Sequence, residues 1–339
     1  MKRTERQPSG EQPVPLSIGL VNNASDRALH ATEAQFVRVL QAASGSFDLT
    51  FKLFTTPEIA RSTPPLDRAG NRYADIGDLF GSRLDALIVT GMEPQAKTLP
   101  DEPVWDKITR LVDWAADNSV PVIWSCLAAH AAVLYLDGIG RMRLPDKLSG
   151  IFDCNVLPSG HILTSELPSQ WSSPHSRYHD LSRAALVASD YQILSWSDEA
   201  GVDVFLKQQE TTSLFFQGHP EYDADTVARQ YARDVRRYLL HESNEYPAIP
   251  RHIFDPTTEA ALADARDHAS RSGDGLHDFA AIVSLIRGAA TSSQWQQSAI
   301  AIYAKWLKLV ARQVTPGRFP HPYDATPGGQ DTFAQIVGA

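Results

Sequence analysis

The sequence predicts an α/β protein with a doubly wound, mostly parallel sheet that carries an antiparallel extension. Short apolar strands alternate with amphipathic helices over residues 16–136, and this alternation is typical of parallel βαβ units with helices on both faces of a sheet. Residues 150–218 instead contain short apolar runs separated by turns, the pattern of antiparallel strands. At 339 residues, of which 43% are hydrophobic, the chain is long enough to bury a large core.

Each element of the first half follows from its apolar pattern. Most of the expected strands are continuous apolar runs bounded by Pro, Asn or Gly, as buried parallel strands are. They lie at residues 16–21, 47–54, 86–90 and 121–124. The first two expected helices repeat their apolar residues every three or four positions, and the third is a run of small residues. They lie at residues 32–43, 104–116 and 127–136.

The second half is predicted to add short strands and then helices. The strands are expected at residues 150–157, 161–167, 191–197, 202–207 and 213–218. A helix capped by Asp225 or Thr226 is expected to run to Leu240, because both residue types favour a helix N-terminus. Further helices are expected within residues 254–294, and an amphipathic helix at residues 295–314.

These elements predict one domain between two tails. The polar residues 1–14 are expected to form a flexible N-terminal tail, and they lack the apolar segment of a signal peptide. Residues 15–315 are expected to form a single α/β domain, with residues 254–294 as a helical insertion. The C-terminal residues 316–339 are rich in Pro and Gly and are expected to be loose.

Charge and composition narrow the classes of function. The chain has 31 Lys and Arg against 40 Asp and Glu, a net charge of −9, which argues against binding to a phosphate backbone. No apolar run reaches the roughly 18–20 residues of a membrane span, and no metal or nucleotide motif occurs. The two cysteines, Cys126 and Cys154, cannot form a disulfide framework and favour a reducing cytoplasm. The histidines are scattered, and His175 is expected to be structural. We expect a cytoplasmic protein that acts on small molecules.

Cys126 is the most informative residue for function. It follows an apolar strand and precedes a helix of small residues, at the carboxyl end of a strand, where α/β folds bind their ligands. The positive end of the following helix would favour its thiolate. Taken alone, Cys126 is either a nucleophile or, more often in such a position, a buried structural cysteine.

A second polar group follows the strand expected at residues 213–218. In the segment Gly218-His-Pro-Glu-Tyr222, His219 and Glu221 lie two residues apart, so an extended chain points both the same way. An imidazole oriented by a carboxylate is a suitable base for a cysteine nucleophile. Alone, such a segment is more often a simple turn. Together with Cys126, it predicts a Cys–His–Glu site.

Both groups belong to longer motifs. The most specific are Pro174-His-Ser-Arg-Tyr178 and Gly218-His-Pro-Glu-Tyr-Asp223, and shorter ones occur at 85–91, 124–126, 146–150 and 231–234. With these motifs the chain resembles the homoserine O-acyltransferases of methionine biosynthesis over about residues 16–310. The resemblance implies a class I glutamine-amidotransferase-like fold, a three-layer, flavodoxin-like architecture.

The resemblance also implies a role for each matched residue. Cys126 would carry the acyl group as a thioester, His219 would be the general base, and Glu221 would orient it. The hydroxyl group of homoserine would then attack the thioester in a ping-pong reaction. The matched substrate-binding residues are Arg233, which would hold the amino-acid carboxylate, Lys147 and Ser176.

The acyl donor implied by the resemblance is an acyl-CoA, with no bound cofactor or metal. Backbone N–H groups of Leu127 and Met92 would stabilise the oxyanion. The position that separates acetyl from succinyl transfer, Glu or Gly in the family, is Gln95. A neutral amide can donate to the distal carboxylate of succinate, so succinyl-CoA is slightly favoured over acetyl-CoA.

Departures from the family pattern leave the acceptor open. Leu127 and His130 stand where the family has Trp and Gln, and residues 22–27 also differ. One alternative is O-acylation of serine or another hydroxy-amino acid. Others are a glutamine-amidotransferase-like hydrolase and a non-catalytic ligand-binding relative. The sequence does not choose between a monomer and a homodimer.

Overall fold

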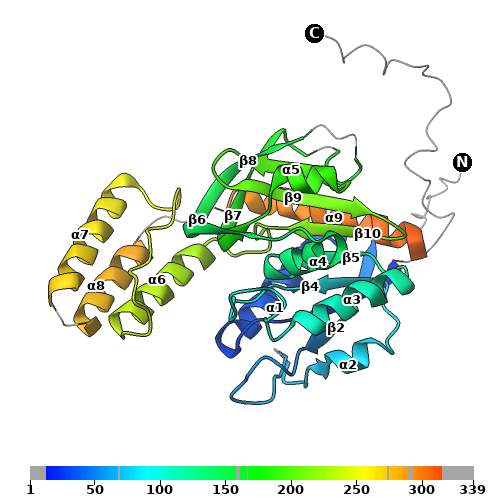
Figure 1. Cartoon of the computed structure of the whole chain (residues 1–339), viewed down its shortest axis with the longest axis horizontal. Helices are drawn as coiled ribbons and strands as arrows, with labels where there is room; N and C mark the ends of the chain where they lie inside the picture. The colour runs from blue at the N-terminus through cyan, green and yellow to red at the C-terminus, as the bar shows by residue number, and fades with distance from the viewer. Residues whose placement is uncertain are drawn as a thin grey trace, which may run out of the picture.

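A computed structural model of the chain describes residues 13–67, 69–157, 161–165, 167–272, 275–288 and 293–314. Its described strands form one sheet (Figure 1). Six neighbouring strands are parallel, in the order β3 (Ala74–Asp75), β2 (Phe47–Thr55), β1 (Val14–Val21), β4 (Ala86–Val89), β5 (Val122–Ser125) and β10 (Thr212–Phe216). The sheet continues antiparallel through β9 (Gly201–Gln208), β8 (Gln192–Ser197), β6 (Met142–Val156) and β7 (Gln170–Asp180). The predicted fold class is confirmed.

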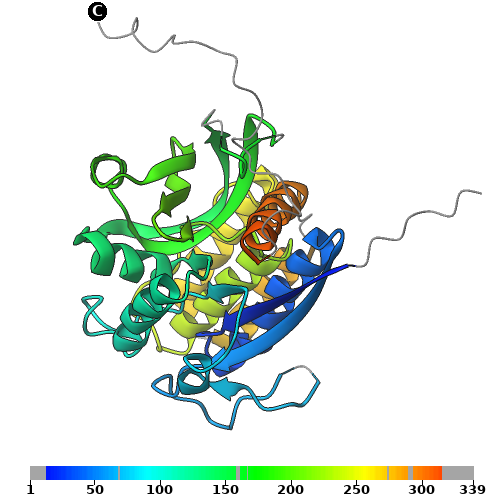
Figure 2. The same ribbon diagram turned by 90° about the vertical axis from the view of Figure 1, so that its right-hand side faces the viewer.

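Helices cover both faces of this sheet (Figure 2). One face packs against α1 (Asp26–Ala43) and α9 (Trp295–Val314). The other packs against α2 (Ile76–Leu79), α3 (Trp105–Asp117), α4 (Leu127–Asp137) and α5 (Arg183–Ala188). The period of two along β1 explains this division, because Ile18 and Leu20 enter the first core and Val21 the second.

Three helices form a separate group at the side of the sheet (Figure 1). They are α6 (Thr226–Leu239), α7 (Pro256–Ser272) and α8 (Gly275–Gly288), and they share a small apolar core that includes Val235, Leu262 and Ile282. Helix α6 begins at Thr226, as the capping residues predict. The helices expected within residues 254–294 are α7 and α8.

Some sequence expectations about elements are wrong. Residues 161–165 form a turn instead of a strand, because the N–H groups of Thr164 and Ser165 donate to the carbonyl oxygen of His161 at 3.0 and 3.1 Å. Its apolar residue Leu163 is fully buried, so it fills the core from a turn. Helix α1 starts at Asp26 instead of residue 32, and residues 1–12 and 315–339 of the predicted tails lie outside the described residues.

Strand β7 contains the motif Pro174-His-Ser-Arg-Tyr178 and was not predicted as a strand. Proline cannot donate a ladder hydrogen bond, so Pro174 argues against a central strand. Strand β7 is the last strand of the sheet and pairs only with β6, so the lost donor costs little. Across the described ranges, no helix is both long and apolar enough to span a membrane.

Candidate active site

Cys126 lies in the tight turn between β5 and α4, at the carboxyl end of a parallel strand. Its backbone has a φ of 51° and a ψ of −115°, a strained conformation for a residue with a side chain. The Cys126 N–H donates to the carbonyl oxygen of Phe216 at 2.8 Å, and the carbonyl of Cys126 accepts from the His130 N–H at 3.1 Å. These two bonds tie the turn to β10 on one side and to α4 on the other. They hold the Cys126 thiol at the edge of the sheet.

Gly91 lies directly against this turn. A Cβ atom at Gly91 would lie 2.9 Å from the carbonyl oxygen of Ser125 and 3.0 Å from the Cβ of Cys126. Only glycine permits this approach, which brings the loop after β4 beside the thiol. Met92, the residue predicted with Leu127 to supply an oxyanion donor, is on that loop and lines the same cavity.

The structure brings the three predicted catalytic residues together. His219 follows β10, and its Nδ1 lies 2.8 Å from Oε1 of Glu221. The imidazole also hydrogen-bonds the Cys126 side chain. The His219 backbone N–H donates to the carbonyl oxygen of Pro174 at 2.7 Å, and Tyr222 stacks on the ring with centroids 4.2 Å apart. Residues 220 and 221 form a turn, in which the Tyr222 N–H donates to the carbonyl oxygen of His219 at 3.1 Å, so His219 and Glu221 meet across a turn and not along an extended chain.

The surroundings of Cys126 favour an ion pair with His219. Burial raises the pKa of the Cys126 thiol, but the hydrogen bond and charge of His219, together with the charge of Arg177, lower it below its usual range. Burial also lowers the pKa of His219. The oxygen atoms of Tyr222 and Glu221 and the Cys126 sulfur outweigh burial and raise the pKa of His219 well above its usual range. A thiolate beside an imidazolium is the reactive form of a cysteine nucleophile.

A cavity of about 350 Å³ opens in front of the thiol. The predicted substrate and oxyanion residues all line it: Gln95, Met92, Leu127, Lys147, Ser176 and Arg233. They come from five separate parts of the chain, and the fold collects them at the carboxyl edge of the parallel strands and on the neighbouring β6, β7 and α6.

The two predicted cationic residues are already paired with acids. Nζ of Lys147 lies 2.7 Å from Oδ2 of Asp234, and Nη2 of Arg233 lies 2.7 Å from Oδ1 of the same carboxylate. Nη1 of Arg233 lies 3.9 Å from Glu93, which also pairs with Arg237. The sequence indicated Arg233 and Lys147 as separate binding residues, whereas the structure places them in one ion-pair network.

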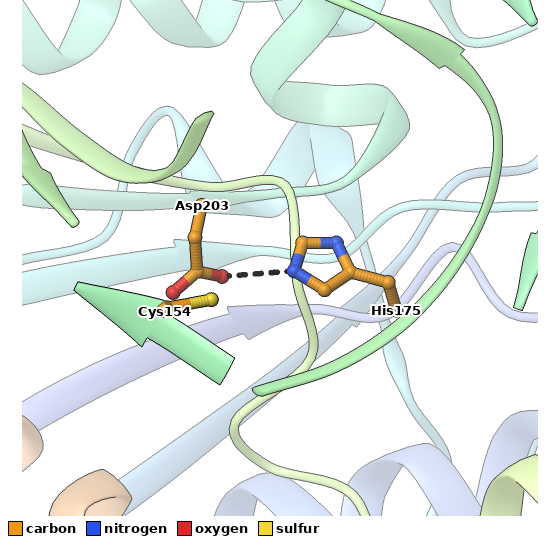
Figure 3. Close-up of side chains that lie close together, drawn as sticks. All are labelled: Cys154, His175 and Asp203. Carbon is orange, nitrogen blue, oxygen red and sulfur yellow. Dashed lines mark ion pairs between the residues drawn. The ribbon is translucent and has the colours of Figure 1, made fainter. Parts of the chain in front are cut away.

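A buried polar group beneath the His219 segment was not predicted. The Asp203 carboxylate accepts hydrogen bonds from Ser173 and Ser195, both at 2.8 Å, and from Trp171 at 3.1 Å. It also lies 3.2 Å from Nε2 of His175, with the Cys154 sulfur beside it (Figure 3). A Cβ at Gly218 would lie 2.5 Å from Oδ1 of Asp203. The group therefore sets the path of the chain just before His219.

Cys154, His175 and Asp203 are residue types that bind metals, yet this group does not fit a metal site. Both Asp203 oxygens already accept hydrogen bonds, and all three side chains are fully buried. Burial raises the pKa of the Cys154 thiol. The expected structural role of His175 agrees with this arrangement.

Comparison with known proteins identifies the family. The family model described as Homoserine O-succinyltransferase matches residues 2–317. A Homoserine O-succinyltransferase of Rhodopseudomonas palustris is 46% identical over 88% of this chain and 89% of its own length, and one of Methylorubrum extorquens is 42% identical over 88% of each. Among solved structures, a glutamine amidotransferase of Methylobacillus flagellatus superposes with a TM-score of 0.47 and 16% identity over 88% of this chain and 94% of its own. By the family match and these two relatives, the chain belongs to the homoserine O-succinyltransferase family.

Proposed function

We propose that this chain transfers a succinyl group from succinyl-CoA to the hydroxyl group of L-homoserine, as a step of methionine biosynthesis. Membership of the homoserine O-succinyltransferase family supports this reaction and both substrates. The observation that carries the covalent route is the hydrogen bond between Cys126 and His219 inside the cavity. The unpaired thiols of Cys126 and Cys154 support a cytoplasmic location.

In the proposed mechanism, the Cys126 thiolate attacks the thioester carbonyl of succinyl-CoA. The carbonyl oxygen becomes an oxyanion beside the backbone N–H groups of Leu127 and Met92, and the intermediate collapses as CoA leaves. His219 protonates the departing sulfur. The homoserine hydroxyl then attacks the new thioester and gives its proton to His219. The second collapse releases O-succinylhomoserine and restores the thiolate–imidazolium pair.

The acceptor is proposed to bind at Arg233, Lys147 and Ser176. The Nε and Nη2 atoms of Arg233 face Asp234, whereas Nη1 is 3.9 Å from its nearest acid. That nitrogen is the donor that a homoserine carboxylate would reach without breaking the pair with Asp234.

Intact-mass analysis after incubation with succinyl-CoA tests the proposal. We expect a succinyl adduct that homoserine removes with release of O-succinylhomoserine, and no adduct on Cys126→Ala. Serine in place of homoserine tests the alternative acceptor, and its faster removal of the adduct would replace homoserine in the proposal. Loss of the adduct to water at the same rate with or without an acceptor would indicate a hydrolase. Full activity of Cys126→Ala would rule out the thioester.

A further inference from the structure

A buried cation lies beside the position that governs acyl choice in the resemblance. Arg141 immediately precedes β6 and lines the cavity together with Gln95 and Cys126. Its side chain is only 5% exposed. Arginine is almost never this buried without an ionic partner, so its pairing decides whether it can also bind a ligand.

The partner of Arg141 is a single acid behind the cavity wall. Nη2 of Arg141 lies 3.4 Å from Oε1 of Glu102, whose other oxygen accepts the backbone N–H of Gln95 at 3.0 Å. Glu102 is 1% exposed and does not line the cavity, whereas Arg141 does. Among the described residues, Glu102 is the one hydrogen-bond partner of this guanidinium. The remaining N–H groups of Arg141 are therefore available to a ligand in the cavity.

The other buried guanidinium near the thiol already has a partner on each of its three nitrogens. Arg177 donates from Nη1 and Nη2 to the carbonyl oxygens of His179 and Ala200, and from Nε to Nδ1 of His175 at 3.4 Å. It is also paired with Asp180 at 3.2 Å. A carboxylate could bind Arg177 only by displacing one of these partners, so Arg141 is the better receptor.

The two histidines near Arg141 do not add positive charge to this part of the cavity. Burial first, and nearby guanidinium groups in addition, lower the pKa of His130 to about 3 and that of His179 to about 4, so both rings are neutral at pH 7. The charges of Arg141 and Cys126 also interact. Arg141 is therefore a buried positive charge in the cavity, near the sulfur, with N–H groups that a ligand can use.

We propose that Arg141 binds the free carboxylate of the succinyl group while its other end is bound to Cys126. A planar guanidinium can offer a carboxylate two parallel hydrogen bonds, and an acetyl group has no atom there to accept them. Arg141 is then a specificity-determining residue for the acyl donor, and it acts together with Gln95. The inference rests on the proposed succinyl transfer and adds the residue that recognises the succinyl group.

The test compares succinyl-CoA with acetyl-CoA in the wild-type chain and in Arg141→Gln. The ratio of kcat/KM for succinyl-CoA to that for acetyl-CoA should fall roughly 10- to 100-fold, the loss expected for a charge-assisted hydrogen bond. The kcat/KM for homoserine should not change, because in a ping-pong reaction it does not depend on the rate of acylation. Release of CoA in the absence of homoserine should show the same selective loss, because the defect lies in acylation of Cys126.

Two controls separate recognition from folding. Arg143 is an exposed arginine two residues away, and Arg143→Gln should leave the donor ratio unchanged. Arg141→Gln leaves the buried Glu102 carboxylate without its ionic partner. The double variant Glu102→Gln/Arg141→Gln removes both charges and should lose the same preference for succinyl-CoA over acetyl-CoA. An equal loss with both donors, or an unchanged ratio in the two Arg141 variants, would overturn the role of Arg141. If the wild-type chain forms no acyl-enzyme with either donor, the proposed function itself is wrong and the role of Arg141 falls with it.

Discussion

Replacement of Glu221 by Gln tests how the His219 imidazole is held. The Nδ1–Oε1 distance is 2.8 Å, and both side chains are largely buried, so the carboxylate both orients the ring and stabilises its charged form. Glu221→Gln keeps the shape of the side chain and removes its charge. A charge-assisted hydrogen bond contributes about 1.5–3 kcal/mol, which corresponds to roughly a 10- to 100-fold loss of rate. The amide can also donate to Nδ1, which would place the proton on Nε2 and lower the rate further.

The assay is the steady-state rate of succinyl transfer, combined with alkylation of Cys126 by iodoacetamide at a series of pH values. The thiolate is the reactive form, so alkylation slows as the pH falls through the lowered pKa of Cys126. Without the Glu221 charge, the imidazolium is less stable and stabilises the thiolate less. We therefore expect the midpoint of alkylation to move to higher pH in Glu221→Gln.

The chain contains a matched control for this change. Glu199 accepts a hydrogen bond from His252 at 3.1 Å, and both side chains are about half exposed. This pair has the same residue types as His219–Glu221 but lies at the surface. Glu199→Gln should alter neither the rate nor the alkylation midpoint, since an exposed pair of this kind contributes little. Wild-type kinetics and an unchanged midpoint in Glu221→Gln would refute the assignment of Glu221 as the orienting residue.

Three further predictions follow from particular contacts. Gly218→Ala should destabilise the fold by about 1–3 kcal/mol in urea unfolding, because the new Cβ would lie 2.5 Å from Oδ1 of Asp203. It should also lower the transfer rate. An unfolding midpoint equal to that of the wild-type chain would contradict this prediction. In the wild-type chain at neutral pH, iodoacetamide should modify Cys126 and spare Cys154, whose burial raises its pKa; peptide mass mapping that finds Cys154 modified first would contradict the described burial. Gln95→Glu should lower the use of succinyl-CoA relative to acetyl-CoA by charge repulsion, and an unchanged donor ratio would remove Gln95 from acyl selection.

The sequence predicts best those features that local pattern determines. The strand before Cys126 is a continuous apolar run and the helix after it is rich in small residues, so the position of the thiol at their junction follows from short-range rules. The two-residue spacing of His219 and Glu221 predicted that both point the same way along an extended chain, but the structure brings them together across a turn. That His219 reaches Cys126 depends on the parallel pairing of β10 with β5, which joins residues about ninety positions apart. The residue types suggested this contact, and the resemblance supported it, but no local pattern determines it.

What the sequence could not show is the pairing of charged groups. Lys147, Arg233 and Asp234 are readable as separate surface charges, and no spacing rule indicates that two cations share one carboxylate. Arg141 and Glu102 are 39 residues apart, and each lies in a segment without regular secondary structure, so no spacing rule predicts that they pair. Strand β7 was hidden by Pro174, whose acceptability depends on an edge position that only the assembled sheet reveals.

The distribution of these charges suits two substrates that enter one cavity in turn. At its outer end, the three cations Arg233, Lys147 and Arg237 share the two acids Glu93 and Asp234. One positive charge is therefore in excess there, which suits the carboxylate of an amino acid. Glu93 and Arg233 are 48% and 36% exposed, whereas Arg141 at the inner end is 5% exposed and has one acid behind it. An anionic acyl chain is thus drawn inward and held there when CoA departs. The outer end is then free for the acceptor, which is the order that a ping-pong reaction requires.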